Sequence, residues 1–72
     1  MDYAIRAEMV ASVHSVVVEA GGSVTIGDTL MILESMKMEI PVIAEDGGKV
    51  EKFTVAETEA VNEGQVVAVL TK

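Results

Sequence analysis

The chain has 72 residues, of which 50% are hydrophobic, and its formal net charge is −7. This length allows one small domain, and the acidic charge disfavours nucleic acid as a partner. The absence of cysteine excludes disulfides, iron–sulfur clusters and thiol chemistry. The longest apolar runs, residues 16–18 and 30–33, are far shorter than a membrane span, and the first residues lack the pattern of a signal peptide. We therefore expect a cytoplasmic protein that does not bind membranes.

The composition favours β structure, because thirteen valines suit the pleated, half-buried surface of a strand. In chain order, short strands are predicted at residues 3–6, 13–19, 23–24 and 30–34, then at 39–43, 50–55, 60–61 and 66–71. Gly21-Gly22, Gly27-Asp28, Gly47-Gly48 and Glu63-Gly64 mark the turns. Pro41 is the only proline and favours an edge position or a strand start for residues 39–43. No segment has the periodicity of a helix.

The chain also contains an internal repeat, because a shift of 37 positions aligns residues 1–35 with 38–72 without a gap. The identical pairs are Met1/Met38, Ala7/Ala44, Glu8/Glu45, Val13/Val50, Val18/Val55, Val24/Val61, Gly27/Gly64 and Leu33/Leu70. The matches outside valine indicate that the repeat is real. We therefore expect a single all-β domain over residues 1–72, a flattened barrel or sandwich of two four-stranded antiparallel sheets related by a pseudo-twofold axis.

Only Met36 and Lys37 belong to neither half of the repeat. A two-residue connection between antiparallel strands is a tight hairpin, and its central residues need positive φ. Asn-Gly or Asp-Gly usually fills such a turn, so Met-Lys is a poor choice for closing a sheet. The hairpin at 36–37 therefore indicates a functional demand on these two residues.

The segment Glu34-Ser35-Met36-Lys37-Met38-Glu39 resembles the attachment loop of biotinyl domains, which typically reads Ala-Met-Lys-Met with the lysine biotinylated. The Gly27-Asp28-Thr29-Leu30 turn is similar to the family's Gly-x-x-Leu, and Val61-Asn62-Glu63-Gly64-Gln65 resembles its counterpart in the second half. The resemblance covers essentially the whole chain and is closest in size to small, thumbless biotin/lipoyl attachment proteins. Ser35 replaces the usual alanine, and the glycines expected before Val13 and near Thr58 are absent. The geometry of those two turns is therefore open.

The resemblance implies a non-catalytic carrier with biotin attached covalently to Lys37. Met36 and Met38 would be the flanking residues that a biotin protein ligase recognises. The biotin arm would carry carboxyl between a biotin carboxylase and a carboxyltransferase, and the carrier would be a monomer. An exposed lysine is almost wholly protonated at neutral pH, and Glu34 and Glu39 favour its charged form. The ligase would therefore have to supply the base for attachment.

Two alternatives remain at this point. A lipoyl carrier would serve an oxo-acid dehydrogenase or glycine cleavage, but lipoyl domains usually place Asp before the lysine and Ala after it. An unmodified interaction module would need no lysine at the tip. Other candidate sites are weak: His14 is the only histidine and has no cysteine partner, so we expect no metal site. Glu57, Glu59 and Glu63 are expected to form a solvated acidic face.

Overall fold

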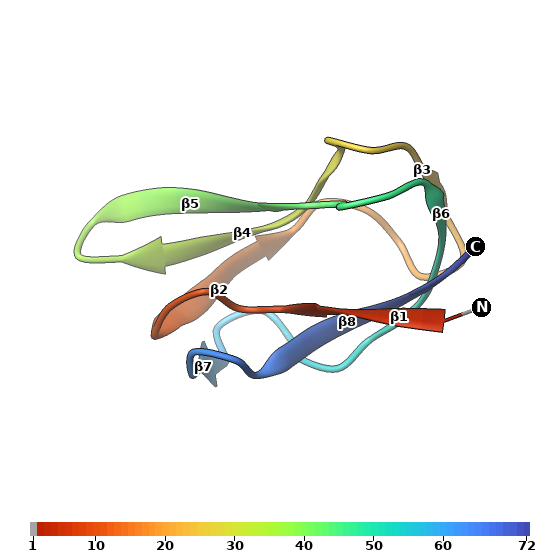
Figure 1. Ribbon diagram of the computed structural model, residues 1–72. Coiled ribbons are helices and arrows are strands. Elements are labelled where there is room, and N and C mark those ends of the chain that lie inside the picture. The colour runs from red at the N-terminus through yellow and green to blue at the C-terminus, as the bar shows by residue number, and fades with distance from the viewer. Residues whose placement is uncertain (1) are drawn as a thin grey trace.

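The computed structural model describes residues 2–72, and in that range every regular element is a strand. The strands are β1 (Asp2–Arg6), β2 (Ala11–Val16), β3 (Ser23–Val24), β4 (Thr29–Ser35), β5 (Met38–Ile43), β6 (Gly48–Phe53), β7 (Ala60–Val61) and β8 (Val66–Thr71). They form two four-stranded antiparallel sheets, one in the order β1-β8-β6-β3 and the other in the order β5-β4-β2-β7 (Figure 1). The expected all-β class is confirmed.

The two sheets are related by the repeat seen in the sequence. A shift of 37 residues carries β1, β2, β3 and β4 onto β5, β6, β7 and β8, and it converts one sheet order into the other. The pairing registers follow the same rule, since Tyr3 opposite Leu70 corresponds to Ile40 opposite Leu33. The pseudo-twofold symmetry is therefore present in the hydrogen-bonded ladders as well as in the sequence.

Each half also carries two matching β-bulges. In β4 and β8, the register skips Leu30 and Val67, so each of these residues lies inward beside an inward neighbour. Leu30 and Met31 are consequently both buried, as are Val67 and Ala68. In β2 and β6 the register skips His14 and Glu51. A bulge leaves its extra residue outside the ladder and bends the strand, which allows each sheet to close over the core.

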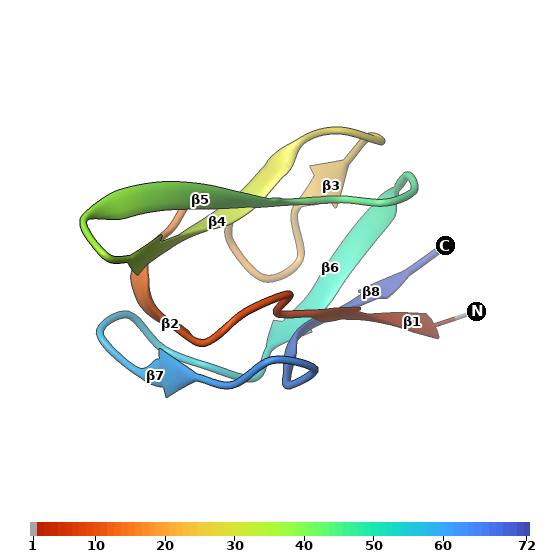
Figure 2. The same cartoon turned by 60° about the vertical axis from the view of Figure 1, so that its left-hand side comes forward.

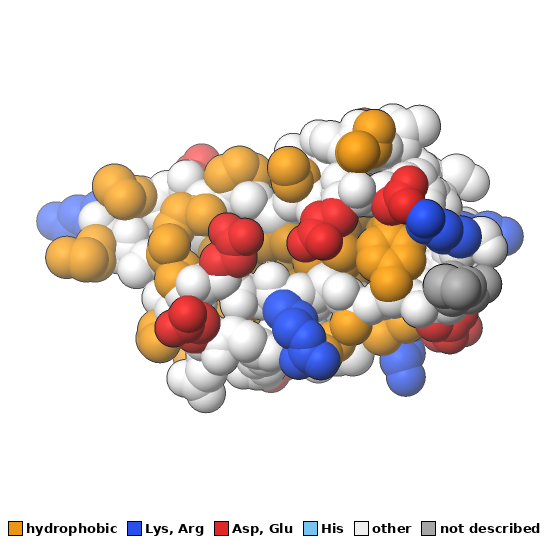
Figure 3. All heavy atoms as spheres, viewed as in Figure 1, with side chains coloured by type: hydrophobic (Ala, Val, Ile, Leu, Met, Phe, Trp, Pro, Cys, Tyr) orange, Lys and Arg blue, Asp and Glu red, His pale blue; other side chains and the backbone are white. Residues whose placement is uncertain are grey.

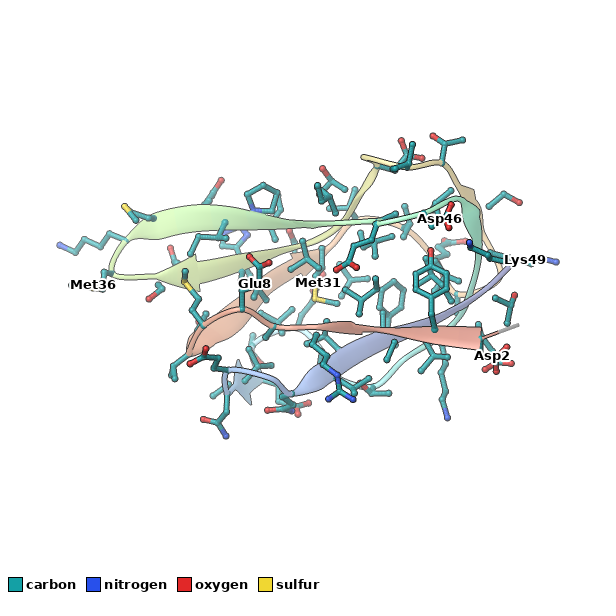
Figure 4. The ribbon with its side chains drawn as sticks, in the orientation of Figure 1. Asp2, Glu8, Met31, Met36, Asp46 and Lys49 are labelled. Carbon is teal, nitrogen blue, oxygen red and sulfur yellow. The ribbon has the colours of Figure 1, made fainter. Side chains whose placement is uncertain are left out.

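The core lies between the sheets and is entirely apolar within the described residues. Its fully buried side chains include Ile5, Leu30, Met31, Leu33, Leu70, Val13, Val50, Val61 and Val67. Figure 4 shows the labelled Met31 in the interior, between the ribbons of the two sheets. Burying a side chain of this size contributes about 1.5–3 kcal/mol. The core is therefore the main source of stability for so small a domain.

All eight predicted strands are present, but the prediction places two of them two or three residues too late in the chain. The strand predicted at 13–19 is Ala11–Val16, and the one predicted at 50–55 is Gly48–Phe53. Val55 belongs to the core and Val18 packs against it, yet both lie outside any strand. Their apolar character therefore does not indicate strand pairing. At the other end, Ala11 and Ser12 pair with β7, which starts β2 earlier. Pro41 lies in the edge strand β5, as expected.

The turns before β4 and β8 show why the repeat keeps a glycine at Gly27 and Gly64. Both have positive φ, 90° and 85°, a region that glycine enters without steric cost. Each amide then donates to the opposite half, Gly27 N to Ala44 O at 2.9 Å and Gly64 N to Ala7 O at 2.8 Å. These bonds fix the strands that follow, including β4, which leads to the hairpin.

Thr58 is the one β-branched residue with positive φ (73°) in residues 2–72, and its repeat counterpart is Gly21 (φ 90°). A left-handed backbone costs a non-glycine residue roughly 1–2 kcal/mol. Glycine recovers this but loses more entropy on folding. We expect Thr58→Gly to raise the free energy of unfolding by about 0.5–1 kcal/mol, as measured by urea denaturation. The matched exchange Gly21→Thr should lower it, and a stabilised Gly21→Thr variant would contradict this account.

Asp46, in the turn before β6, ties the two ends of the chain together. Its carboxylate accepts hydrogen bonds from Lys72 Nζ and from the Gly47 amide, the latter at 2.8 Å. Its backbone oxygen accepts from the Tyr3 hydroxyl at 2.7 Å. The Lys72 hydrogen bond, followed by the Gly47 bond, lowers the pKa of Asp46 below 3.8, and the same contact raises the pKa of Lys72 above 10.5.

These shifts predict a weak pH dependence of stability. Stabilisation by Asp46 is complete above pH 3.8 and is lost as the pH falls through its lowered pKa in the folded state. Stabilisation by Lys72 is complete below pH 10.5 and is lost as the pH rises through its raised pKa. We expect Asp46→Asn to lose less stability than the unsubstituted protein on acidification below pH 3.8. Urea titrations of both proteins across this range measure the difference, which is small because the pair is exposed. Equal losses would contradict the role of Asp46.

The molecule is elongated, with extents of 33 × 17 × 17 Å. The β4–β5 hairpin projects at one end, and both termini lie at the other (Figures 1 and 2). A cavity of about 170 Å³ lies between the edge strands β1 and β5, and its lining includes the repeat-related pair Glu8 and Glu45. No helix in residues 2–72 has the length and hydropathy needed to cross a membrane.

Candidate functional site at the tip of the β4–β5 hairpin

The hairpin turn consists of Met36 and Lys37 alone, because Ser35 at the end of β4 pairs with Met38 at the start of β5. Their φ values are 53° and 65°, so both residues adopt the left-handed backbone of a type I′ turn. This conformation costs a non-glycine residue roughly 1–2 kcal/mol. Paired strands on both sides hold the turn in place. The backbone cost is therefore accepted at a rigid apex that presents a lysine.

The side chains of the tip face solvent. Met36 is 91% exposed and Met38 is 62% exposed, and Lys37 is exposed between them. In Figure 3 hydrophobic and basic side chains lie together at the end of the molecule formed by this hairpin. Within residues 2–72, no hydrogen bond or ion pair holds the Lys37 amine. The amine is therefore accessible and is not held by a neighbouring side chain.

Acidic groups lie just below the apex. Glu34 and Glu39 are directly opposite each other across the hairpin, a placement that is unfavourable for like charges. His14, the bulge residue of β2, places its Nε2 atom 3.8 Å from Glu39 Oε2. Both side chains are exposed, so this contact stabilises the hairpin little. These two carboxylates lie three and two residues from Lys37 along the hairpin and do not contact its amine.

The structure brings together the three residues singled out in the sequence, since Met36, Lys37 and Met38 form the apex and its first strand position. Sequence reasoning missed the contact between His14 and Glu39. The three glutamates expected to form a solvated acidic face are exposed. Two of them also hold backbone: Glu57 accepts from the Val16 amide at 3.0 Å and Glu59 from the Ala56 amide at 3.1 Å. Within the described residues, no cluster of side chains could hold a metal ion.

A primary amine that is rigidly presented and free of partners fits covalent attachment of a carboxylic acid through an amide bond. Residues 4–70 match the family described as "Biotin-requiring enzyme". The chain belongs to this family. It is a biotin carrier domain, and its cofactor is covalently attached biotin.

Two relatives show the same extent as the carrier domain. This chain is 48% identical over 67 residues to the "Biotinylated protein TB7.3 homolog" of Mycobacterium leprae. The alignment covers 93% of this chain and 94% of the relative. It is 39% identical over 67 residues to the "Biotin/lipoyl attachment protein" of Bacillus subtilis, covering 93% of this chain and 92% of the relative.

A solved structure shows the same fold inside a much longer protein. The carrier domain superposes on the urea carboxylase of Kluyveromyces lactis with a TM-score of 0.93 and 31% sequence identity. The match covers 99% of this chain but only 6% of that carboxylase. The fold expected from the resemblance to biotinyl domains is thus confirmed.

Proposed function

We propose that Lys37 is the residue to which biotin is attached, and that Met36 and Met38 are the side chains by which a biotin protein ligase recognises it. One observation carries the proposal: the Lys37 amine lies at the apex of a rigid two-residue turn and makes no hydrogen bond or ion pair within residues 2–72. The backbone cost of placing Met and Lys in this turn is otherwise unexplained.

Attachment joins the lysine nitrogen to an activated carboxyl carbon, and the amine must lose a proton to become nucleophilic. Exposed lysines are almost wholly protonated at neutral pH. Glu34 and Glu39 face each other below the apex, and neither contacts the Lys37 amine to take its proton. The ligase therefore supplies the base. This requirement keeps the domain from modifying itself.

The hairpin then serves as a rigid base for a flexible arm. Its strands are held by cross-strand pairs from Ser35 and Met38 at the tip to Thr29 and Ile43 at the far end. Tethering converts the encounter of biotin with an active site into a local event with a raised effective concentration. A fixed apex presents the arm in the same way to each enzyme that uses it.

The partners of the loaded domain are a biotin carboxylase and a carboxyltransferase, and the domain itself is a non-catalytic carrier. Biotin, when bound, supplies the ureido nitrogen that carries carboxyl between the two active sites. The likeness to a urea carboxylase of Kluyveromyces lactis supports this assignment. We place residues 1–72 in one carrier domain, with halves 1–35 and 38–72 about the hairpin at 36–37. The domain acts as a monomer in the cytoplasm.

Intact-mass spectrometry of the protein co-expressed with a biotin ligase tests the proposal. We expect one biotinyl group per chain, detected also by avidin blotting, and complete loss of both signals in Lys37→Arg. Lys49→Arg is the matched control, because Lys49 is also exposed and lies in β6, away from the hairpin. A lipoyl-sized mass, no added mass, or modification that survives in Lys37→Arg would overturn the assignment.

A further inference from the structure

The methionines of the described residues differ sharply in exposure. Met31 is fully buried, Met9 is 39% exposed, and the two that flank Lys37 are the most exposed, Met36 at 91% and Met38 at 62%. Figure 4 shows the labelled Met36 at the extreme end of the hairpin, far from the buried Met31. Two accessible thioethers thus lie immediately beside the amine that is to be modified.

We propose that Met36 and Met38 form an oxidation site that controls the loading of Lys37, an inference that rests on the proposed function. The oxidant is hydrogen peroxide. The sulfur lone pair attacks the terminal peroxide oxygen, the S–O bond forms as the O–O bond breaks, and water leaves after proton transfer. Sulfur is oxidised by two electrons and the peroxide is reduced by two. Reductases can reverse the product, methionine sulfoxide.

Because of the composition of the tip, oxidation of the two methionines greatly changes the surface that a docking protein meets. In residues 34–39, Met36 and Met38 are the only apolar residues, beside Glu34, Ser35, Lys37 and Glu39. Oxidation turns a flexible apolar side chain into a polar one, so the tip would lose all of its apolar surface. A ligase that recognises the lysine through its neighbours would then have to bury two polar sulfoxides without their water.

The position of the tip at the projecting end of the hairpin leaves these side chains uncovered. Met36 has φ 53° in a two-residue turn, and Met38 is paired with Ser35 in the ladder. Both side chains are uncovered, Met36 at 91% and Met38 at 62% exposure, where the hairpin projects from the end of the molecule (Figure 1). The methionine surface that is open to the ligase is therefore also open to the oxidant. This couples methionine oxidation to biotinylation of Lys37.

The test treats the unloaded protein with dilute hydrogen peroxide, locates sulfoxides by peptide mapping, and then measures biotinylation by a biotin ligase. We expect Met36 and Met38 to oxidise first, Met9 more slowly, and Met31 not at all while the protein is folded. The kcat/KM of the ligase should fall about tenfold or more, and treatment with methionine sulfoxide reductases should restore it. Met9→Leu removes the one other exposed methionine of residues 2–72, and the fall should persist in that variant.

The untreated protein is assayed first, which separates this inference from the proposed function. Absence of biotin on Lys37 in the untreated protein would overturn both. Normal loading of untreated protein, together with unchanged kcat/KM after Met36 and Met38 are oxidised, would overturn the oxidation site alone. Protection of the Met9→Leu variant from the loss would also overturn it, because the sensitive residue would then lie away from the tip.

Discussion

Exchanging the two turn residues, Met36→Lys together with Lys37→Met, is expected to lower the kcat/KM of a biotin ligase for this domain by about 100-fold or more. The double variant keeps the composition, the net charge and a lysine in the turn. It moves the amine by one residue, and neighbouring Cα atoms are 3.80 Å apart. In a type I′ turn with φ values of 53° and 65° the two side chains also point in different directions. A displacement of about 1 Å can reduce a rate about 100-fold when an active site requires one geometry.

Stability supplies the control for this exchange. Both positions are exposed and both already have positive φ, so Met and Lys should tolerate either place equally well. Urea denaturation should therefore give the same free energy of unfolding for the variant and the unsubstituted protein. Rapid biotinylation of a stable exchanged variant would show that the ligase reads the turn only loosely, and that the rigid apex is not what selects Lys37.

The hairpin is the part of the site that could be predicted from the sequence. The gapless repeat leaves Met36 and Lys37 as the join between strands, and a two-residue join fixes which residues are opposite each other. The facing pair Glu34 and Glu39 follows from the same count. The repeat is informative here because the two halves have matching strands and turns. Residues 36–37 belong to neither half, so they mark the connection between the halves.

The positions of β2 and β6 could not be predicted as well, because apolar residues continue there beyond the end of each paired strand. Val18 and Val55 are repeat-related and pack on the core after the ladders of β2 and β6 have ended. The contact between His14 and Glu39 depends on the bulge in β2, which places His14 outside the ladder. Residue patterns carry little signal for a bulge, since it changes the register by a single residue.

The repeat indicates a positive φ at Thr58. The repeat pairs it with Gly21, and a glycine in one half marks a backbone position where positive φ is favoured. The glycine missing near Thr58 left the turn geometry open, and the structure shows that the geometry is kept. The chain retains the left-handed conformation at Thr58, although this conformation is sterically unfavourable for a β-branched residue.

Replacing Gly48 with alanine is expected to lower the free energy of unfolding by about 3 kcal/mol or more. A Cβ atom built at Gly48 lies 2.3 Å from the backbone oxygen of Thr71, which is far closer than packed atoms allow. Its φ of 155° is also in a region that side chains rarely adopt. Because the obstacle is backbone in β8, relief requires β6 and β8 to separate at the point where they begin to pair. The measurement is urea denaturation, and the total stability of such a domain is only about 4–11 kcal/mol.

Gly47→Ala is the matched control, one residue away. The nearest atom to a Cβ at Gly47 is the Val24 backbone oxygen at 3.7 Å, an ordinary contact, so that variant should keep nearly the full stability. The repeat sharpens the comparison, because the counterpart of Gly48 is Ala11, which carries a Cβ at the start of β2 and is not among the residues with positive φ. If Gly48→Ala were as stable as Gly47→Ala, the start of β6 would be able to adopt the backbone of Ala11. The two halves would then share one geometry, and the departure from symmetry at Gly48 would not be enforced by β8.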